Sequence, residues 1–389
     1  MHRPTKGLFM KTVHGLYSSA IIFTTNNSNT AIDDYALAQI QMLCDNEASK
    51  GSTIRIMPDV HPGKFGTIGL TMTIHDRILP NLVGIDIGCG MTLAELKGSK
   101  LEYQKLDSVI RDHIPSGFAI RNKTHRFAEE FDFTSLRCFK SIRAEKAMLS
   151  LGTLGSGNHF LEVDRDDNGT LYVVIHSGSR HLGKEVTEYY LNEGQKLLKA
   201  NGINVPFELT YLEGKLMEDY LHDLQIAQEF ATLNREIMLD ELAKGMKWKI
   251  LDSYSCIHNY VEDSETTDSG TPILRKGAIS AKQNEKVIIP INMKEGILLG
   301  TGLGNTEWNC SAPHGSGRIM KREDIKQNYT LSSFKAEMKG IYSSCISKDT
   351  LDEAPFAYRP LDDIAEVIKN TVNITKILRP VYNFKAGGQ

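Results

Sequence analysis

The segment Leu171-Tyr172-Val173-Val174-Ile175-His176 places an unbroken apolar run directly before a histidine. A short apolar run rich in β-branched residues is typical of a strand that is buried on both faces. The turn Ser177-Gly178-Ser179 follows, and it supplies residues that can cap a helix. Apolar residues at helical spacing then extend over residues 182–199. We therefore predict a buried strand that ends at His176, then a tight turn and an amphipathic helix.

Four other short segments also bring a metal-capable residue to a turn rich in glycine, serine or asparagine. They are Asp86-Ile87-Gly88-Cys89-Gly90, Gly157-Asn158-His159-Phe160, Ile257-His258-Asn259 and Pro313-His314-Gly315-Ser316-Gly317. Tens of residues separate these segments, so only folding can bring them together. A single histidine is more often a structural residue, but polar residues repeated at strand-end turns favour a shared site. We predict one composite site on strand ends and loops.

Strand and helix signals alternate irregularly along the rest of the chain. Strands are predicted at residues 54–57, before a turn at 58–63, at 81–87, before a glycine break at 88–90, and at 286–290. Two consecutive helices are predicted within residues 211–246, one helix starting near Arg318, and one over residues 361–378 closed by Pro380. Neither a repeat nor a linker divides the sequence. The pattern predicts an α+β fold: a single large domain over residues 1–389, with mixed β-sheets flanked by helices.

The composition excludes several classes of protein. With 41% hydrophobic and 24% charged residues, the chain resembles an ordinary globular protein. No apolar run approaches the roughly 20 residues that cross a bilayer, so we expect a cytoplasmic protein without a membrane partner. No CxxC pair occurs among the cysteines, which fits free thiols in a reducing compartment. The net charge of −3 neither indicates nor excludes nucleic acid, because a basic groove can lie on a neutral protein.

Asp86 and Cys89 lie three residues apart across a glycine-rich break, and both side chains can bind a divalent ion. A thiolate can bridge two ions, and the imidazoles of His159, His176 and His258 could complete such a pair of sites. Mixed oxygen, nitrogen and sulfur ligands suit zinc, and also manganese where phosphate oxygens join the site. The pattern therefore indicates a metal centre with zinc and manganese as alternatives.

His314 lies in a different setting. Gly315 and Gly317 leave the backbone free to approach a phosphate, and a helix starting near Arg318 would direct its N–H groups at the same anion. Arg318 adds a permanently charged phosphate partner. A histidine here could attack phosphorus and form a phosphoramidate, although a loop histidine that caps a helix is the alternative. Arg180 follows the turn after His176 in the same way.

Seven motifs in a fixed order carry a resemblance to a known family. They are MPDVH at 57–61, VGIDIGCG at 83–90, LGTLGSGNHFLE at 151–162, HSGSR at 176–180, HNYV at 258–261, RKGA at 275–278 and HGSGR at 314–318. By these motifs the chain resembles the RtcB family of RNA-splicing ligases. The resemblance implies a single RtcB-like domain whose active site lies at strand ends and loops.

The resemblance also implies the reaction and its partners. Such enzymes are RNA ligases that depend on GTP and Mn²⁺. They join RNA ending in a 3′-phosphate or 2′,3′-cyclic phosphate to RNA beginning with a 5′-hydroxyl, through a guanylated histidine and an RNA with GMP on its 3′-phosphate. The expected setting is RNA repair or tRNA splicing, and an archease-like activator is a possible partner.

Specific residues receive roles from the motif match. Cys89 is expected to bridge two Mn²⁺ ions, with Asp86 and His159 on one ion and His176 and His258 on the other. His314 is expected to take GMP from GTP, and Asp59 to handle the substrate phosphate or a metal-bound water. Arg180 and Arg318 are expected to contact RNA phosphate. The residues expected to bind the guanylate are Asn158, His159, Phe160, Glu162, His258, Asn259, Pro290, Asn292, Met293, His314, Gly315, Gly317, Tyr358 and Lys385.

One loop departs from the family pattern. Where the family usually has Pro-Gly-Ser-Met-Gly, the chain reads Pro290-Ile291-Asn292-Met293-Lys294, and a later serine is replaced by Ile297. A backbone that depended on glycine would have to shift there. The change leaves open a metal-dependent phosphodiesterase that opens cyclic phosphates without ligating. A non-catalytic RNA-binding protein is disfavoured because the metal-capable residues and His314 are all retained.

Two clusters of basic residues admit two interpretations. They could follow an RNA backbone, or they could form a solvated helix face. The clusters are Arg121, Lys123 and Arg126, and Arg137, Lys140, Arg143 and Lys146.

Overall fold

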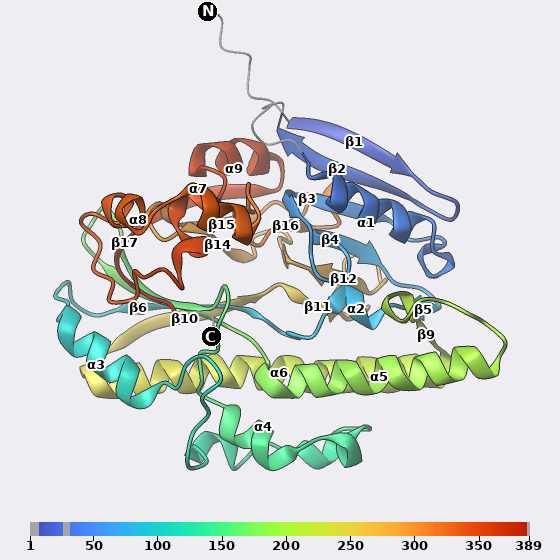
Figure 1. The fold of residues 1–389 in the computed structure, drawn as a ribbon, viewed down its shortest axis with the longest axis horizontal. Coiled ribbons are helices and arrows are strands. Elements are labelled where there is room, and N and C mark those ends of the chain that lie inside the picture. The colour runs from blue at the N-terminus through green and yellow to red at the C-terminus, as the bar shows by residue number, and fades with distance from the viewer. Residues whose placement is uncertain (1–7, 26–31, 387–389) are drawn as a thin grey trace, which may run out of the picture.

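Two larger β-sheets form the centre of the computed structural model, which describes residues 8–25 and 32–386 (Figure 1). The remaining residues of the expected 1–389 domain lie outside this description. The first sheet is mixed, because β2 and β3 run parallel while its other neighbours run antiparallel. Its strand order is β1 (Leu8–His14), β2 (Ser19–Thr25), β3 (Ile54–His61), β4 (Ile68–Thr73), β12 (Ile273–Lys276) and β11 (Asn259–Glu262).

The second sheet is antiparallel throughout and carries the strand predicted at residues 171–175. Its order is β10 (Ile250–Ile257), β6 (Gly90–Leu96), β8 (Leu171–Ser177), β7 (Phe160–Arg165), β17 (Val372–Phe384), β15 (Gly296–Gly302) and β14 (Lys286–Asn292). Two small sheets pair β5 (Arg77–Ile78) with β9 (Leu212–Glu213) and β13 (Ala278–Ser280) with β16 (Ser311–Pro313).

Helices cover the outside of these sheets, and the long helices α5 and α6 lie side by side beneath them (Figure 1). The helices are α1 (Asp34–Cys44), α2 (Pro80–Val83), α3 (Tyr103–His113), α4 (Ala144–Ser150), α5 (Arg180–Ala200), α6 (Gly214–Met246), α7 (Arg322–Asn328), α8 (Leu331–Glu337) and α9 (Leu361–Val367). Within the described ranges, no helix combines the length and apolar character that a membrane crossing requires. The predicted α+β class is confirmed.

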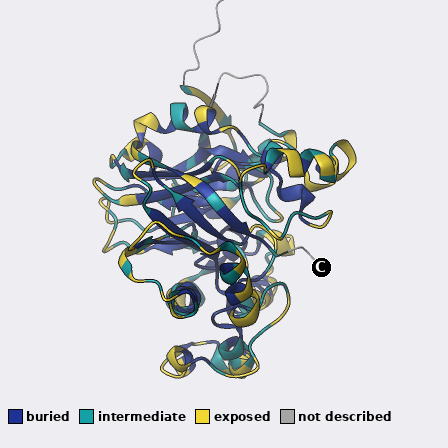
Figure 2. Ribbon diagram, turned by 90° about the vertical axis from the view of Figure 1, so that its left-hand side faces the viewer, coloured by how far each residue is buried: buried dark blue, intermediate teal, exposed yellow. Residues whose placement is uncertain are grey.

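Buried residues concentrate in the central strands, whereas the peripheral helices and loops are largely exposed (Figure 2). Every residue of β8 is buried, because α6 covers one face of its sheet and further strands cover the other. The prediction of a buried strand ending near His176, then a turn and an amphipathic helix, is confirmed by β8 and α5. The strand predicted at residues 286–290 is also confirmed, as part of β14.

Two predicted elements near the N-terminus are wrong in part. Residues 81–87 do not form a strand: Pro80 occupies the first turn of the short helix α2, and irregular turns follow it. Proline is favoured in a first helical turn because its missing N–H has no helical partner there. The strand at residues 54–57 does not stop at Pro58 but runs to His61, with its pairing to β4 interrupted between Ile56 and His61.

Three predicted helices differ in the structure. Instead of two consecutive helices within residues 211–246, the structure has one helix of 33 residues, α6, which begins at Gly214 after the short strand β9. No helix starts at Arg318, since the next helix, α7, begins at Arg322. The helix predicted over residues 361–378 ends at Val367, and residues from Val372 onward form β17, which contains Pro380.

A buried asparagine on α6 joins the helix to two loops of the second sheet. The Asn234 side-chain oxygen accepts hydrogen bonds from the backbone N–H groups of Gly152 and Thr153, at 2.7 and 3.1 Å. Its amide nitrogen donates to the carbonyl oxygens of Thr153 and Gly178 and to the Ser177 hydroxyl. One side chain therefore holds the loop after α4 against the end of β8.

We expect Asn234→Ala to lower the free energy of unfolding by about 2–4 kcal/mol, because several buried backbone groups lose their partner. Thermal or urea unfolding of the full chain measures this loss. The exposed Asn201, at the end of α5, is the matched control, and Asn201→Ala should change stability by no more than about 0.5 kcal/mol. Equal stabilities of the two variants would contradict the role assigned to Asn234.

Candidate metal and nucleotide site

Three neighbouring strands bring metal-capable side chains to one edge of the second sheet. Cys89 lies directly before β6, His159 lies directly before β7, and His176 lies near the end of β8. Because β8 runs antiparallel to both neighbours, the starts of β6 and β7 meet the end of β8. The register pairs Met91 and Phe160 with His176. The predicted convergence of these segments is therefore present in the fold.

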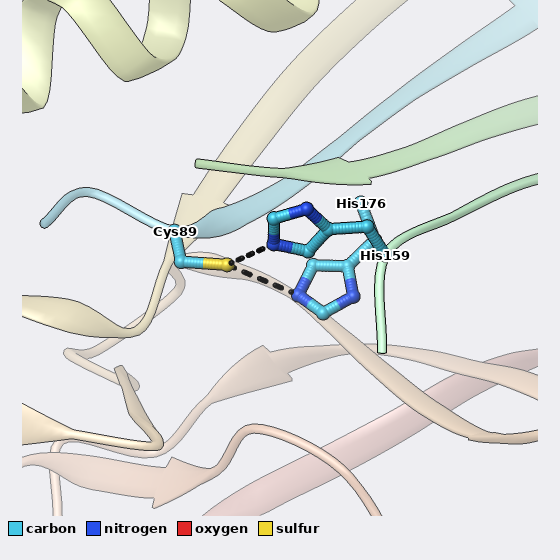
Figure 3. A group of neighbouring side chains, drawn as sticks. All are labelled: Cys89, His159 and His176. Atoms are coloured by element: carbon cyan, nitrogen blue, oxygen red, sulfur yellow. Dashed lines mark hydrogen bonds between the residues drawn. The ribbon is translucent and has the colours of Figure 1, made fainter. Parts of the chain in front are cut away.

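Cys89, His159 and His176 are buried and point toward one another (Figure 3). The Cys89 sulfur lies 3.4 Å from Nε2 of His159 and 3.3 Å from Nε2 of His176. Their candidate ligand atoms all lie within 4.8 Å of one another. This spacing allows one ion to contact all three side chains.

The cluster continues in both directions from Cys89. On one side, Nε2 of His159 lies 2.9 Å from a carboxylate oxygen of Asp86. On the other side, Nε2 of His176 lies 3.3 Å from Nε2 of His258. His258 directly follows β10, and its backbone N–H donates to the carbonyl of Cys89. The five predicted ligands thus form a row with the thiol at its centre.

Hydrogen bonds and burial fit this row to a divalent cation. His159 and His176 each direct Nδ1 at a backbone carbonyl, that of Leu154 and that of Asn158, so Nε2 is the ring atom that is available to a metal ion. These Nε2 atoms face a thiol, a carboxylate and a further imidazole. Burial lowers the pKa of His176 and of His258, which keeps both imidazoles neutral and able to bind a metal. A cation among these atoms would contact sulfur, oxygen and nitrogen ligands together.

The thiol and the carboxylate respond differently to this setting. Burial, with the charge of Asp86 added, raises the pKa of Cys89, so the thiol stays protonated unless a cation stabilises the thiolate. Burial opposes ionisation of Asp86, but the adjacent His159 outweighs it and lowers the pKa of this carboxyl below its usual value. Asp86 is therefore a carboxylate at neutral pH.

His314 lies beside the row and is held by a buried carboxylate. Its Nδ1 is 2.7 Å from Oδ2 of Asp59, and the His314 ring centroid lies 4.7 Å from that of His258. Asp59 is 0% exposed, and its other oxygen has no hydrogen-bond partner within the described residues. Asp59 thus lies directly against Nδ1 of His314. Its expected role with the substrate phosphate or a metal-bound water stays a prediction.

A cavity of about 150 Å³ opens beside His314. All the residues expected to bind the guanylate line it, except three. His159 and His258 belong to the metal row instead. Asn259 lies behind them, where its side chain donates to the backbone of Asp86 and accepts from that of Gly277.

The altered loop has an irregular strand pairing at Ile291 but no strained backbone there. Ile291 lies within β14 and has no left-handed backbone conformation, so no glycine is needed there. Ile297 lies in β15 and is fully buried among apolar side chains. The Asn292 amide is occupied within the loop, donating to Glu295 at 2.7 Å and accepting from the backbone N–H groups of Lys294 and Glu295. Several residues of this loop, among them Pro290, Asn292 and Met293, line the cavity.

The two arginines expected to contact RNA phosphate are both engaged with protein groups. Arg318 lines the cavity, where it pairs with Glu353 at 3.3 Å and donates to the Tyr358 hydroxyl at 3.2 Å. Arg180 begins α5 and donates to the Thr153 hydroxyl and to the carbonyl of Gly117. These contacts fix the positions of both guanidinium groups.

The cavity also contains residues that the sequence did not single out. Lys385 lies 2.6 Å from Glu353, and Arg322 pairs with the same carboxylate. Although burial opposes it, the charges of Lys385, Arg322 and Arg318 lower the pKa of Glu353 to about 2. His61 also lines the cavity, and burial lowers its pKa to about 4. His61 belongs to the MPDVH motif, which could have indicated that it lies at the site. Arg322 and Glu353 belong to none of the seven motifs.

Acidic side chains neutralise arginines of both basic clusters. Arg121 and Arg126 pair with Glu241 and Asp240 of α6. The contacts of the second cluster join Arg137 to Asp219 and Arg143 to Glu185. These pairs favour a solvated, salt-bridged helix face over a free path for RNA phosphates.

Comparison with known proteins identifies the family. The family described as tRNA-splicing ligase RtcB matches residues 47–386. RNA-splicing ligase RtcB1 of Escherichia coli is 31% identical over 364 residues, which cover 84% of this chain and 88% of that protein. RNA-splicing ligase RtcB2 of the same organism is 25% identical over 407 residues, covering 95% and 97%. The tRNA-splicing ligase RtcB of Pyrobaculum aerophilum is 26% identical over 414 residues, covering 83% and 85%.

These relatives are all named as RNA ligases, and the class of enzyme expected from the motifs is confirmed. The chain belongs to the RtcB family.

A pair of buried carboxyl groups lies beside the cavity at His314. Glu162 and Asp164 both project from β7, and the Asn383 amide donates to Glu162. Neither oxygen of Asp164 has a hydrogen-bond donor within the described residues. Two adjacent carboxylates repel in a buried setting, so the pair retains a proton. Burial raises the pKa of Glu162 to about 7, and burial together with Glu162 raises the pKa of Asp164.

We expect Cys89→Ala to lower the affinity for Mn²⁺ by at least about tenfold, since even the loss of a group behind a ligand costs this much. Isothermal titration calorimetry measures the affinity, and circular dichroism confirms that the variant is folded. Cys138 is also a buried free thiol but lies outside the row, so Cys138→Ala should bind Mn²⁺ like the parent. A Cys89→Ala variant with unchanged affinity and stoichiometry would remove Cys89 from the metal site.

We expect Asp164→Asn to flatten the pH dependence of stability. The folded pKa values of both carboxyls are raised, so the folded state binds more protons than the unfolded state. The stability from this pair is present below pH 4.5 and is lost as pH rises to about 7. An asparagine amide can donate to Glu162 without ionising, so the variant should lose less stability over this range, by on the order of 1–3 kcal/mol.

Urea unfolding at successive pH values measures the effect of Asp164→Asn. The exposed Asp167, in the turn after β7, provides the control, because Asp167→Asn should leave the parent's pH dependence in place. If Asp164→Asn has the same pH profile as the parent, the two carboxyls do not share a retained proton.

Proposed function

We propose that the protein is a GTP- and Mn²⁺-dependent RNA ligase that acts in the cytoplasm in RNA repair or tRNA splicing. It would join RNA 3′-phosphate or 2′,3′-cyclic phosphate ends to 5′-hydroxyl ends. The observation that carries the proposal is the Asp59–His314 pair, which lies between a cation-binding row and a cavity lined by the expected nucleotide contacts. A metal centre alone would not require a buried carboxylate behind a cavity histidine.

Asp59 prepares His314 for attack on phosphorus. With the proton of His314 held on Nδ1 by the carboxylate, the lone pair stays on Nε2. Asp59 also stabilises the positive charge that the ring gains as it forms a bond to phosphorus. The neighbouring imidazole of His258 is neutral and therefore does not repel that charge.

The proposed reaction transfers GMP from GTP to His314, then to the RNA 3′-phosphate, and finally releases it. Nε2 of His314 attacks the α-phosphorus of GTP, an Nε2–P bond forms and pyrophosphate leaves. An oxygen of the RNA 3′-phosphate then attacks the same phosphorus, which moves GMP to the RNA and frees His314. The 5′-hydroxyl oxygen of the second RNA attacks the activated 3′-phosphorus, and GMP leaves. A cyclic phosphate end must first be opened by water to a 3′-phosphate.

The residues of the row, Asp86, Cys89, His159, His176 and His258, would hold the proposed Mn²⁺ ions. When bound, these ions would supply charge stabilisation at the attacking and leaving oxygens of each displacement. Lys385, Arg318 and Arg322 line the cavity and would hold the nucleotide phosphates or base in place.

A cyclic phosphodiesterase that does not ligate is the second candidate. The observation in its favour is that the Asn292 amide is bonded within its own loop, where the family usually has a serine. Such an enzyme would retain the metal row but would not transfer GMP to His314. The two functions therefore differ in whether the protein becomes labelled by GTP.

We expect the protein to acquire acid-labile label from α-labelled GTP and Mn²⁺ without RNA, and His314→Ala to acquire none. Asp59→Asn should slow labelling by about 10²–10⁴-fold, because the side chain no longer stabilises a charged imidazole. His222→Ala is the control, since His222 lies on the partly exposed face of α6. Label that persists in His314→Ala would contradict the assigned nucleophile. An unlabelled parent that still opens cyclic phosphates would establish the phosphodiesterase.

A further inference from the structure

Phe118 is an exposed aromatic side chain at the edge of the active site. It lies in the connection after α3, and 81% of its surface is exposed. Single exposed apolar residues are common and need no explanation by themselves. The position of Phe118 is informative for a different reason, because its loop is hydrogen-bonded to the loop that leads to His159.

Backbone hydrogen bonds fix the Phe118 loop to the segment that leads into His159. Gly117 donates its N–H to the carbonyl of Gly155 at 2.9 Å, and Ser116 forms an isolated parallel bridge with Gly155. Arg180, at the start of α5, donates to the carbonyl of Gly117 at 3.3 Å. The aromatic ring is therefore exposed to solvent, while the loop that carries it is hydrogen-bonded both to the segment before His159 and to the start of α5.

A groove of about 410 Å³ runs from Phe118 toward the nucleotide cavity. Lys385 lines both the groove and the cavity, so the two spaces adjoin. Hydroxyl groups of Ser116, Ser344 and Ser347 line the groove, together with Asp349 and the exposed guanidinium of Arg111, which pairs with Asp107. This lining offers hydrogen-bond donors and an arginine along a path that ends at the proposed reaction centre.

We propose that this groove binds the unpaired RNA strand next to the ends being joined, with Phe118 stacking on a base. The proposal rests on the proposed function, because it takes RNA as the substrate. Single-stranded nucleic acid is bound by aromatic faces for the bases and by polar and cationic groups for the backbone. Phe118 supplies the aromatic face, and the groove lining supplies the polar and cationic groups. Stacking tolerates any base, which suits a ligase that must accept varied ends.

A protein partner fits this groove less well. Protein interfaces have a packed apolar core surrounded by a polar rim. Among the exposed large apolar side chains of the described residues, only Phe118 lines the groove. One isolated ring above hydroxyl and basic groups matches a nucleobase more closely than an apolar protein surface.

The test measures the affinity of the full chain for a fluorescent single-stranded RNA with a 3′-phosphate, in the presence of Mn²⁺ and without GTP. Phe118→Ala should weaken binding about tenfold, the loss expected for one stacked base. Phe118→Trp should retain affinity, whereas Phe118→Leu should lose it like alanine, because leucine keeps apolar area but has no aromatic face. Phe207→Ala removes another exposed phenylalanine, on the connection between α5 and α6, and should bind RNA like the parent.

RNAs with 2-aminopurine at successive positions identify the stacked nucleotide. Quenching at one position near an end, lost in Phe118→Ala and Phe118→Leu, supports the proposal and identifies that end. Equal affinity of parent and Phe118→Ala would overturn it, as would parent-like binding by Phe118→Leu. RNA binding that depends on Phe118 in a protein that never ligates would contradict the proposed function and leave the groove assignment standing.

Discussion

A fully buried arginine on α6 holds the loops of the metal row in place. One nitrogen of Arg235 donates to the carbonyls of Gly88 and Ser177, both at 2.9 Å, and its Nε donates to the Thr92 hydroxyl at 3.1 Å. Burial lowers its pKa to about 10, so the group remains charged at neutral pH. A buried charge is tolerated only when its donors are satisfied. The ends of β6 and β8 that carry Cys89 and His176 must therefore stay where the guanidinium can reach them.

Close packing explains why two of the loops contain glycine. Gly88 has a φ of +68°, and a Cβ there would approach Gln228 and Ala231 of α6 at 2.9 Å. At Gly178 a Cβ would overlap the Asp86 carboxylate. The glycines thus let one loop pack against the helix and the other against the Asp86 carboxylate. Together with Asn234 next to Arg235, they fix the directions of the cysteine and histidines before any cation binds.

Local sequence patterns predicted a helix or strand correctly where one periodicity dominated. They failed where pairing between distant segments determined the secondary structure. The apolar run at β8 and the helical spacing after it predicted both elements. In residues 361–378, β-branched residues such as Val372, Ile374 and Ile377 favour a strand, and pairing with β7 and β15 makes β17 from a segment whose spacing also fitted a helix. The α6 segment contains no proline, and its only glycines lie at its ends, so nothing in it requires the break that was predicted.

Motifs predicted which residues gather at the site but not how they pair. The Asp59–His314 contact joins residues 255 positions apart, and no local pattern links a buried aspartate in β3 to a loop histidine. The cluster around Glu353 depends in the same way on α7 and on the segment after β17, which tertiary packing brings together. Sequence order therefore predicted the composition of the site, while the hydrogen-bond and charge partners required the fold.

The fixed charges around Glu353 would favour the proposed nucleotide, although the neighbouring loop differs from the family pattern. Lys385, Arg318 and Arg322 would repel one another without Glu353, and this carboxylate holds them at set positions before a ligand arrives. An anionic nucleotide would then meet cations that need little further ordering, so less conformational entropy is lost on binding. The Asn292 amide is held within its own loop, where it donates to Glu295 and accepts from the backbone N–H groups of Lys294 and Glu295. In the proposed ligase, nucleotide binding therefore depends more on the ordered cations of this cavity than on side chains of the 290–297 loop.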